Sequence, residues 1–464
     1  MFYKRKVYDS LVKWKQEGSK KAILIEGLRQ IGKSTLCEEF VNKNYTNVYK
    51  FDFRENEDDR LIFTSNFNLD SFKEDLFIRF KKEYNDNDAV LLLDEIGDCP
   101  NARAAIKYLL KETNFDIIAT GSLLGVHGFS SRKKRSPSVG FTHYCTMHSF
   151  DFEEFLWAIQ IPDTIIQRIK ESVVTSTPLD EKNHNLLKKL FKHYIITGGM
   201  PEAVAQYLSS HDFAKVITTN TDKLKEMQGD FGRVLDKNGE VTTDNDLLFR
   251  TNEVYSVLVP ELAKDNAKFQ FSMIRKGARS KEYEKTITWL EDYGLVCKCY
   301  NLKDLKLPLE GYENIDSYKL YFGDIGLYIA KMGLETASLL LGNELDSYGG
   351  YIYEGIAADI LNKADFPLYY FDNGKSELDF IIQDDNKLAI IEVKMNKGKS
   401  KSAKAIMEGK SNHHADICYR VTDKNFSIGS YYKGVPHYAL PFLLEHIKTK
   451  LLKSLIVEPV KIEE

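Results

Sequence analysis

The chain has 464 residues, which is too long for one hydrophobic core and suits two to four domains of roughly 100 to 200 residues each. Its 43% hydrophobic and 28% charged residues are typical of globular proteins, and no apolar run approaches the roughly 20 residues that cross a bilayer, so no membrane partner is expected. The net charge of -4 argues against a uniformly basic coat for nucleic acid, although local basic faces stay possible.

The cysteines and the first residues predict an intracellular protein. The six cysteines include no CxxC pair and have no nearby histidine cluster, so we expect reduced thiols and no zinc site. The basic segment Met1 to Lys6 is followed by Tyr8, Asp9 and Ser10 rather than by an apolar stretch, so no secretory signal is visible. A cytoplasmic location is therefore expected.

The first 150 residues alternate short apolar strands with amphipathic helices. The expected strands are Ala22 to Glu26, Val48 to Phe53, Ala89 to Asp94 and Asp116 to Thr120. The intervals between them are long enough for crossover helices. This pattern is typical of a parallel sheet that is covered on both faces, so we predict an α/β domain.

A glycine-containing segment directly follows the first expected strand and precedes a helix. It reads Gly27-Leu28-Arg29-Gln30-Ile31-Gly32-Lys33-Ser34, continues with Thr35, and satisfies the P-loop pattern GxxxxGK[ST]. In such a loop backbone N–H groups face phosphate oxygens, Lys33 neutralises the β and γ phosphates, and Ser34 ligates magnesium. Residues 27–35 are therefore predicted to bind ATP with Mg²⁺. A glycine turn that binds nothing would not explain this order of strand, loop and helix.

Two more strand ends carry polar residues that suit a nucleotide site. The strand at 89–94 ends in Asp94 and Glu95, as in the Walker B arrangement. We expect Asp94 to hold the metal through water and Glu95 to position and activate the attacking water. The strand at 116–120 leads into Ser122, and either Ser122 or Thr120 is the candidate sensor of the γ phosphate. In the alternative, these hydroxyls only cap the next turn.

Beyond residue 150 the pattern becomes helical. Apolar residues from Phe152 to Leu156 have helical spacing, and a second helical run extends from Leu186 to Ile195, so a helical lid is expected. Residues 172–184 are polar and rich in turn-forming side chains, and we predict a surface loop there. Ser130 to Ser138 is predicted to be a second, basic loop.

Residues 244–321 predict a small helical module with a β wing. Two apolar stripes have helical spacing, and the second, Ser280 to Tyr293, follows a basic turn. This arrangement resembles a winged helix, in which such a helix enters a major groove. Four basic residues are placed to neutralise phosphates: Arg275, Lys276, Arg279 and Lys281. In the alternative, the module only packs or contacts protein, and its basic loop is solvated.

The last part of the chain carries acidic residues and a lysine in a recognisable order. Glu354 lies in a helical segment, while Glu377-Leu378-Asp379 and Ile391-Glu392-Val393-Lys394 belong to two strands joined by a polar turn at 384–386. Residues two apart on a strand face the same side, so Glu377 pairs with Asp379 and Glu392 with Lys394. Phosphodiester hydrolysis needs carboxylates to hold Mg²⁺ and a lysine to orient water or stabilise developing charge.

This set is similar to the D…ExK residues of the PD-(D/E)xK restriction-endonuclease-like fold. The likeness makes Asp379, Glu392 and Lys394 catalytic, and makes Glu354, Asp379 and Glu392 metal ligands. In the alternative, Glu392 and Lys394 form a surface salt bridge of small energy. A basic run either follows a nucleic-acid backbone or is a solvated helix entrance: Lys394, Lys397, Lys399, Lys401 and Lys404.

Together these motifs resemble the bacterial and archaeal AAA+ type ATPases (AAA_14) that are fused to a DUF4143 domain with a restriction-endonuclease-like core. Besides the P-loop and residues 91–95, the resemblance rests on three segments: 120–122 (TGS), 150–156 (FDFEEFL) and 198–204 (GGMPEAV). In many relatives an arginine follows the glycine before the FxEEF run, whereas here Gly140 precedes Phe141. The trans-acting arginine finger is therefore unassigned, with Arg132 and Arg135 as candidates.

The resulting prediction is an α/β chain of four parts. These are a P-loop ATPase core at 1–160, a helical lid at 161–240, a winged-helix-like module at 241–320 and a nuclease-like α/β domain at 321–464. We expect an ATP-binding and hydrolysing enzyme whose C-terminal domain binds DNA or RNA. The alternatives are a regulatory ATPase switch that binds nucleic acid or protein without cleaving it, and a protein-remodelling ATPase. ATP and Mg²⁺ are the expected cofactors, and the oligomeric state stays open, with a homo-oligomer as one option.

Overall fold

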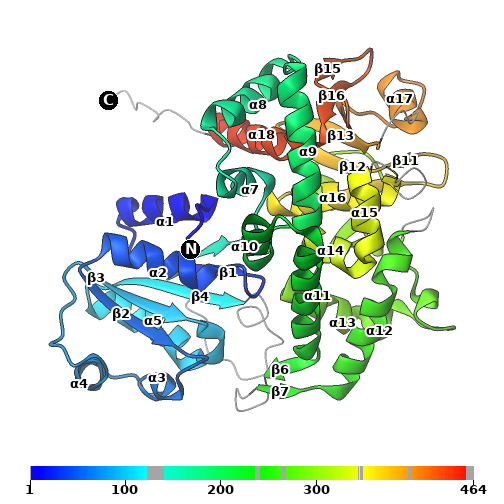
Figure 1. Cartoon of the computed structure of the whole chain (residues 1–464). Helices are drawn as coiled ribbons and strands as arrows, with labels where there is room; N and C mark the ends of the chain where they lie inside the picture. The colour runs from blue at the N-terminus through cyan, green and yellow to red at the C-terminus, as the bar shows by residue number, and fades with distance from the viewer. Residues whose placement is uncertain are drawn as a thin grey trace, which may run out of the picture. The chain divides into compact units, whose positions relative to one another are not determined.

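The computed structural model describes residues 2–122, 140–235, 241–263, 268–342, 344, 349–395 and 400–455. The chain divides into two compact units. Figure 1 labels their helices and strands. Unit 1 is Met1–Phe150, Met227–Asn252 and Tyr283–Leu295, and unit 2 is Asp151–Glu226, Glu253–Glu282 and Val296–Glu464. Three helices contribute residues to both units: α11 (Phe213–Gly229), α12 (Asn245–Leu262) and α13 (Ser280–Tyr293).

Unit 1 contains a five-stranded parallel sheet in the order β2-β3-β4-β1-β5. The strands are β1 (Ala22–Gly27), β2 (Asn47–Asp52), β3 (Ala89–Asp94), β4 (Asp116–Ser122) and β5 (Thr142–Thr146). The α/β prediction is confirmed, because β1 to β4 lie within two residues of the expected strands. The sequence does not predict β5, since this edge strand is polar, partly exposed and lacks an apolar run.

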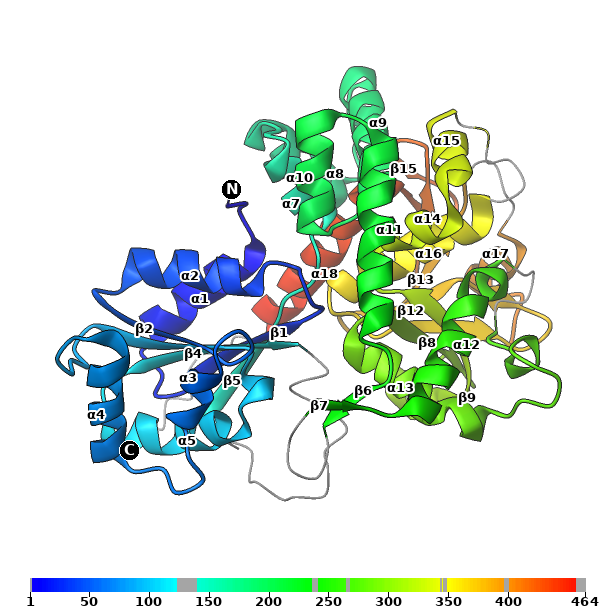
Figure 2. The ribbon, with the colours of Figure 1, turned by 60° about the horizontal axis from the view of Figure 1, so that its bottom comes forward.

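Helices cover both faces of this sheet (Figure 2). α1 (Lys6–Glu17) and α2 (Lys33–Asn44) lie on one face, and α4 (Leu69–Phe80) and α5 (Pro100–Glu112) lie on the other. The short α3 (Glu57–Leu61) and η1 (Ile96–Asp98) complete this part. Four aromatic rings pack together in this core: Phe51 of β2, Phe53 directly after it, Phe63 after α3 and Phe72 of α4. The burial of these large side chains stabilises the packing of helices on the sheet.

Unit 1 also contains a hairpin of β6 (Arg233–Leu235) and β7 (Val241–Thr243). The hairpin comes directly after α11 and before α12. α13 coincides with the helix expected at Ser280 to Tyr293, and three apolar residues at helical spacing on it are buried: Tyr283, Ile287 and Leu290.

The described residues of unit 2 form two sheets. The four-stranded sheet has the order β11-β10-β8-β9, with β8 (Val296–Leu302), β9 (Glu313–Phe322), β10 (Tyr369–Asp372) and β11 (Glu377–Leu378). The five-stranded sheet has the order β12-β13-β14-β16-β15, with β12 (Phe380–Asp384), β13 (Lys387–Val393), β14 (Ile417–Thr422), β15 (Ser427–Ile428) and β16 (Lys433–Pro436). β12 and β13 form the antiparallel pair expected from the turn at 384–386, while β13, β14 and β16 are parallel.

The helices of unit 2 fall into an early group and a late group. The early group is α7 (Phe152–Ala158), α8 (Asp163–Thr175), α9 (Glu181–Thr197) and α10 (Pro201–Ser210). The late group is α14 (Ile325–Met332), α15 (Leu334–Gly342), α16 (Gly349–Lys363), α17 (Lys401–Met407) and α18 (Leu440–Ser454). Single 3-10 turns are η2 (Phe271–Met273), η3 (Leu309–Tyr312) and η4 (His437–Ala439).

The surface loop predicted at 172–184 is wrong in extent. α8 continues to Thr175 and α9 begins at Glu181, so only residues 176–180 connect the helices. Polar residues at helix ends resemble a loop in sequence, because caps and turns use the same side chains. His184 shows the difference, since it is buried and its Nδ1 lies 2.8 Å from the Tyr438 hydroxyl.

The glycine pair before α10 allows two backbone segments of unit 2 to touch. A Cβ added to Gly198 would lie 2.5 Å from the Cα of Gly326 and 2.5 Å from Oδ1 of Asp324, and Gly198 has a φ of +71°. Asp324 accepts hydrogen bonds from the N–H groups of Gly199 and Gly326, each at 2.9 Å. The motif at 198–204 thus joins the α9–α10 turn to the start of α14.

We predict that Gly198→Ala destabilises unit 2, because alanine at a positive φ is strained and its methyl group overlaps the neighbouring backbone. The expected loss is about 2–4 kcal/mol in the free energy of unfolding, measured by denaturant titration. Gly350→Ala is the matched control, since a Cβ at Gly350 meets nothing within 4 Å. Equal midpoints for the two variants would contradict this role of Gly198.

In the described part of the chain, no single helix is long and apolar enough to cross a membrane. The pair α14 and α15, bent by 110°, passes the same test of length and composition when its two helices are taken together.

Candidate nucleotide and carboxylate–lysine sites

The P-loop of unit 1 has the backbone that a phosphate cradle requires. β1 ends at Gly27 and α2 begins at Lys33, so residues 28–32 form the connection. Gln30 and Gly32 have positive φ values of 61° and 89°. A Cβ at Gly27 would lie 2.1 Å from the carbonyl oxygen of Met147, so the start of the loop has no room for a side chain. The loop therefore turns tightly into the N-terminus of α2, where backbone N–H groups attract anions.

The Lys33 ammonium lies inside this loop. Its Nζ donates to the carbonyl oxygens of Gly27, at 3.2 Å, and Leu28, at 2.9 Å. Lys33 is buried, and burial lowers its pKa even though Glu95 and Asp94 favour the charged form. A phosphate at the loop would offer Lys33 stronger acceptors than two carbonyl groups.

The Asp94 carboxylate, at the end of β3, is hydrogen-bonded to hydroxyl groups of α2 and β4. It accepts hydrogen bonds from Ser34 Oγ, at 2.8 Å, and from the Thr120 hydroxyl. Burial raises the pKa of Asp94, with Glu95 adding to the effect. The buried carboxylate and the Ser34 hydroxyl are oxygen donors of the kind that Mg²⁺ prefers, so these residues fit the ion.

The two candidate γ-phosphate sensors, Thr120 and Ser122, have different surroundings. Thr120 Oγ1 accepts from the backbone N–H of Glu95, at 3.1 Å, as well as donating to Asp94. Ser122 is buried at the end of β4 and pairs in register with Gly27, beside the P-loop. Glu95 has a φ of 51°, a strained value for a non-glycine residue and one that occurs often at functional sites. Thr120 thus orients the acidic pair, and Ser122 is the hydroxyl next to the loop.

Two arginine contacts at the P-loop were missed from sequence. Arg29 forms an ion pair with Asp230, which also accepts from the Tyr293 hydroxyl at 2.9 Å. Arg5 is buried and donates from Nη1 to the carbonyl oxygen of Ile31 at 3.0 Å. Arg5 and Asp230 both lie outside the P-loop motif in the sequence, so no local pattern could have indicated these contacts.

The Arg29–Asp230 pair holds the P-loop arginine in a partly buried position. Its side chains are 11% and 20% exposed, so the pair is less screened than a surface salt bridge. Burial works to raise the pKa of Asp230, but the charge and hydrogen bonds of Arg29 outweigh it and the pKa is lowered. Asp230 directly follows α11, the helix that also contributes to unit 2.

We predict that Asp230→Asn weakens ATP binding, because Arg29 loses its charged partner and the loop loses an anchor. The dissociation constant should rise about tenfold, or about 1.4 kcal/mol, in a fluorescent-nucleotide titration. Asp246→Asn is the control, because it removes a more exposed ion pair with Arg250 in the same unit. An unchanged constant for Asp230→Asn would separate this pair from nucleotide binding.

In unit 2 the predicted carboxylate and lysine residues come together. Lys394 Nζ lies 2.9 Å from Glu392 and 3.1 Å from Asp379. Asp379 Oδ2 also accepts from the backbone N–H of Val393 at 2.8 Å. Burial raises the pKa of Glu392 to about 7, with the charge of Asp379 adding to the effect. Burial likewise raises the pKa of Asp379.

Glu354 joins this cluster through partners that sequence reasoning missed. Lys319 Nζ lies 2.7 Å from Glu354 Oε1 and 3.6 Å from Glu377, and the Tyr321 hydroxyl also donates to Glu354. Burial works to raise the pKa of Glu354, but the charge and hydrogen bond of Lys319 outweigh it and the pKa is lowered. The available signal was a lysine within the otherwise aromatic and aliphatic end of β9, residues 318–322.

Lysine side chains contact the carboxylates that are predicted to bind a metal ion. Among the described residues, no three His, Cys, Asp or Glu side chains are arranged to hold a metal ion. Lys394 bridges Asp379 and Glu392, and Lys319 contacts Glu354. The metal roles of Glu354, Asp379 and Glu392 stay predictions.

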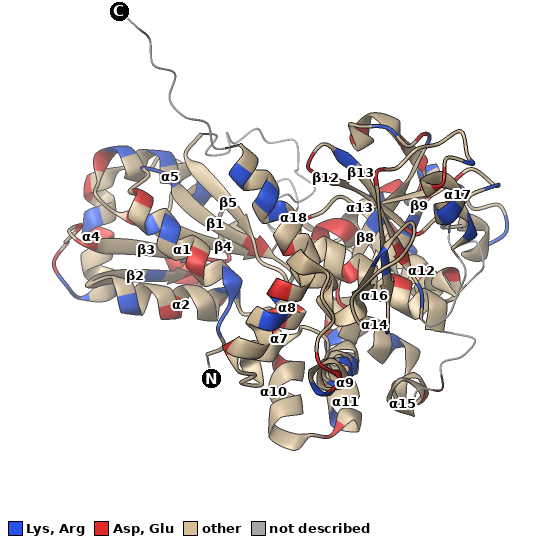
Figure 3. Cartoon of the chain, turned by 90° about the horizontal axis from the view of Figure 1, so that it is seen from above, with Lys and Arg blue, Asp and Glu red and all other residues tan. Residues whose placement is uncertain are grey.

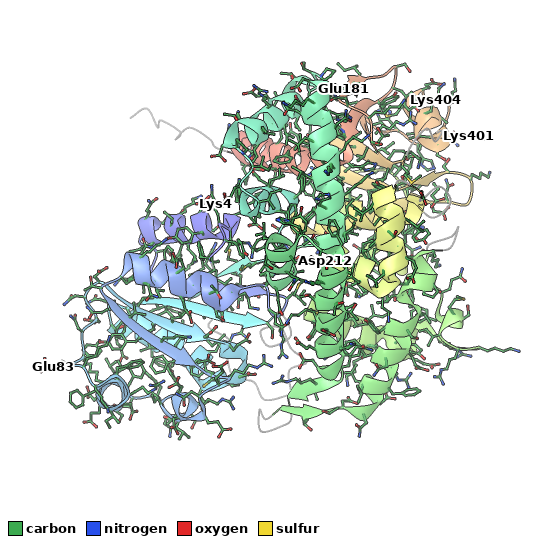
Figure 4. All side chains as sticks on the ribbon, viewed as in Figure 1. Lys4, Glu83, Glu181, Asp212, Lys401 and Lys404 are labelled. Atoms are coloured by element: carbon green, nitrogen blue, oxygen red, sulfur yellow. The ribbon has the colours of Figure 1, made fainter. Side chains whose placement is uncertain are left out.

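Most of the predicted nucleic-acid contacts that are described are exposed, whereas Lys394 is partly buried. The segment Arg275 to Lys281 is largely exposed, with Arg275 paired to Glu282 at 2.8 Å. Lys401 and Lys404 are exposed on α17 (Figure 4). Basic and acidic residues are interspersed over the helices of the chain (Figure 3). The predicted Arg132, Arg135, Lys397 and Lys399 lie outside the described residues.

Models of known protein families match both the N-terminal and the C-terminal parts of the chain. A family model described as an AAA domain (AAA_14) matches residues 19–156, which include the P-loop, Asp94 and Glu95. The chain carries an AAA-type P-loop ATPase domain. Two domains of unknown function match further on, DUF8612 at residues 188–338 and DUF4143 at residues 349–440. The AAA-type and DUF4143 parts of the expected resemblance are thus confirmed, and Glu354, Asp379, Glu392 and Lys394 all lie in the DUF4143 domain.

Solved structures resemble the chain only distantly. The Walker-type ATPase PABY2304 of Pyrococcus abyssi is 14% identical with a TM-score of 0.41, over 71% of this chain and 95% of that one. The Thermotoga maritima RuvB Holliday junction branch migration motor is 13% identical with a TM-score of 0.28, over 64% and 90%. The Drosophila ORC bound to AT-rich DNA and Cdc6 is 12% identical with a TM-score of 0.22, over 71% and 91%. No curated protein matched the chain.

Proposed function

We propose that the chain is an ATP hydrolase whose nucleotide state controls a nuclease-like C-terminal domain that acts on DNA or RNA. The observation that carries the proposal is the contact of Lys394 with both Asp379 and Glu392, on the same chain as a complete P-loop and acidic pair. A carboxylate pair with an adjacent lysine suits phosphodiester chemistry, because the acids bind a divalent ion and the ammonium stabilises negative charge.

In the ATPase domain, the site residues divide into groups that bind phosphate, magnesium and water. The loop N–H groups and Lys33 bind the β and γ phosphates, and Ser34 with Asp94 would hold Mg²⁺. The ion supplies charge neutralisation at the phosphates. Glu95 accepts a proton from the attacking water and orients it, while Ser122 hydrogen-bonds the γ phosphate.

A route for coupling follows from chain connectivity. Arg29 of the P-loop is ion-paired to Asp230, and Asp230 is the residue after α11. α11 begins among the residues of unit 2 and ends among those of unit 1. A phosphate that draws Arg29 away from Asp230 would therefore change the restraint on the end of this helix.

A second candidate function is an ATPase switch whose C-terminal domain binds nucleic acid without cutting it. The ion pair of Lys319 with Glu354 favours it, because an ammonium group already neutralises one of the acids that a catalytic ion would need. Exposed basic residues of α17 and of the segment before α13 would then contact phosphates.

For the ATPase, we predict that Lys33→Ala raises the dissociation constant for MgATP about 100-fold, or about 2.7 kcal/mol, because the phosphates lose their cation. Glu95→Gln should keep binding but lower hydrolysis about 10²–10⁴-fold, so that ATP stays bound. Filter binding and phosphate release measure the two effects. Normal turnover in Glu95→Gln would remove Glu95 from the proposed role.

For the nuclease, purified protein is incubated with linear, supercoiled and single-stranded DNA and with RNA, with Mg²⁺ or Mn²⁺, with and without ATP. We predict that Asp379→Ala and Lys394→Ala each lower cleavage at least about 100-fold, because ion binding and charge stabilisation are lost. Cleavage that persists in both variants belongs to a contaminant. No cleavage by the parent protein, with ATPase activity intact, selects the switch.

A further inference from the structure

Glu354 differs from the other acids of the cluster in its partners. Its Oε1 atom accepts from Lys319 Nζ at 2.7 Å and from the Tyr321 hydroxyl. Both donors come from β9, a strand of the four-stranded sheet, whereas Asp379 and Glu392 contact Lys394, which directly follows β13 of the five-stranded sheet. The cluster therefore contains two separate lysine-centred groups.

Lys319 is buried far more deeply than an ordinary lysine. Its side chain is 2% exposed, and its Nζ lies 4.8 Å from the centre of the Tyr370 ring. A buried ammonium is unfavourable unless anions compensate for lost hydration. Glu354 at 2.7 Å and Glu377 at 3.6 Å supply that compensation, so Lys319 and Glu354 require one another.

The charges of the cluster suggest what this pair does. Four carboxylates, Glu354, Glu377, Asp379 and Glu392, lie close to two ammonium groups, those of Lys319 and Lys394. Lys319 already occupies the Glu354 oxygen that a cation would use, at 2.7 Å, whereas Asp379 and Glu392 share the less buried Lys394. A second cation, at Glu354, would have to displace the buried Lys319 from its carboxylate.

We propose that Lys319 takes the place of a metal ion at Glu354, so that Glu354 is a positioning residue and the cluster accepts one divalent cation, at Asp379 and Glu392. The location of that cation rests on the proposed nuclease-like function, whereas the pairing of Lys319 with Glu354 does not. This assignment differs from the sequence prediction that made Glu354 a metal ligand.

The test is Mn²⁺ binding to the full chain without nucleotide, measured by calorimetry and by the electron paramagnetic resonance signal of free Mn²⁺. Glu354→Gln should bind Mn²⁺ within about twofold of the parent, because glutamine keeps an acceptor for Lys319 and Tyr321. Asp379→Asn should lose at least about tenfold in affinity. Any Mn²⁺ that this variant still binds is bound elsewhere in the chain. A loss in Glu354→Gln as large as that in Asp379→Asn would overturn the proposal.

Lys319→Met provides the opposite test, because it frees Glu354 and Glu377. The variant should bind Mn²⁺ at least about tenfold more tightly than the parent, or bind one additional ion. Lys306→Met is the matched control, since Lys306 forms an exposed pair with Asp304 at 2.6 Å. If circular dichroism shows that Lys319→Met does not fold, Lys319→Gln replaces it.

The outcomes separate this inference from the proposed function. A parent protein that binds no more Mn²⁺ than Asp379→Asn would refute a metal-dependent nuclease. A gain in Lys319→Met would then still support Lys319 as the replacement for a cation. No gain in a folded Lys319 variant would overturn the inference, whatever the parent protein cleaves.

Discussion

A lysine ammonium group that is removed from water must be surrounded by oxygen atoms, and this requirement shapes three places in the chain. Lys33 satisfies it with carbonyl groups of the P-loop, and Lys319 with Glu354. Lys363, 2% exposed, contacts Asp324 at 3.2 Å, Asp359 at 2.9 Å and the Tyr194 hydroxyl at 3.0 Å. In each case the loss of one partner would leave a buried charge, which is more destabilising than the pair is stabilising.

The three lysines differ in how easily their partners can be exchanged. Lys33 contacts neutral carbonyl groups, so a phosphate is a better acceptor and its arrival is favourable. Lys319 and Lys363 contact carboxylates that are themselves buried or partly buried, so exchange would separate opposite charges. This contrast supports the proposal that Lys33 is a ligand-binding group, whereas Lys319 and Lys363 are structural groups.

Local sequence patterns predicted the features that depend on local chemistry. Apolar runs located β1 to β4 within two residues, and the glycine spacing located the loop between β1 and α2. The alternation around Glu392 predicted that Lys394 would lie on the same side. β5 was not predicted because an edge strand needs few apolar residues. The helix ends near 172–184 were not predicted because helix caps and loops have similar compositions.

Partners that are distant in sequence could not be predicted in this way. Asp230 meets Arg29 across 201 positions, and Lys319 meets Glu354 across 35. The four-stranded sheet also pairs β8 with β10, which lie on either side of the boundary expected near residue 320. Hydrophobic periodicity identifies a strand but contains no information about its neighbour in the sheet.

The assembly of unit 1 from three separated stretches of chain has a practical consequence for anyone who wishes to isolate the ATPase. A fragment that stops at residue 150 contains every P-loop and acidic-pair residue but lacks the aspartate and tyrosine that anchor Arg29. Such a fragment would expose surfaces that the later stretches normally cover. No single cut can release this half intact, since its pieces are interleaved with those of the other half along the polypeptide.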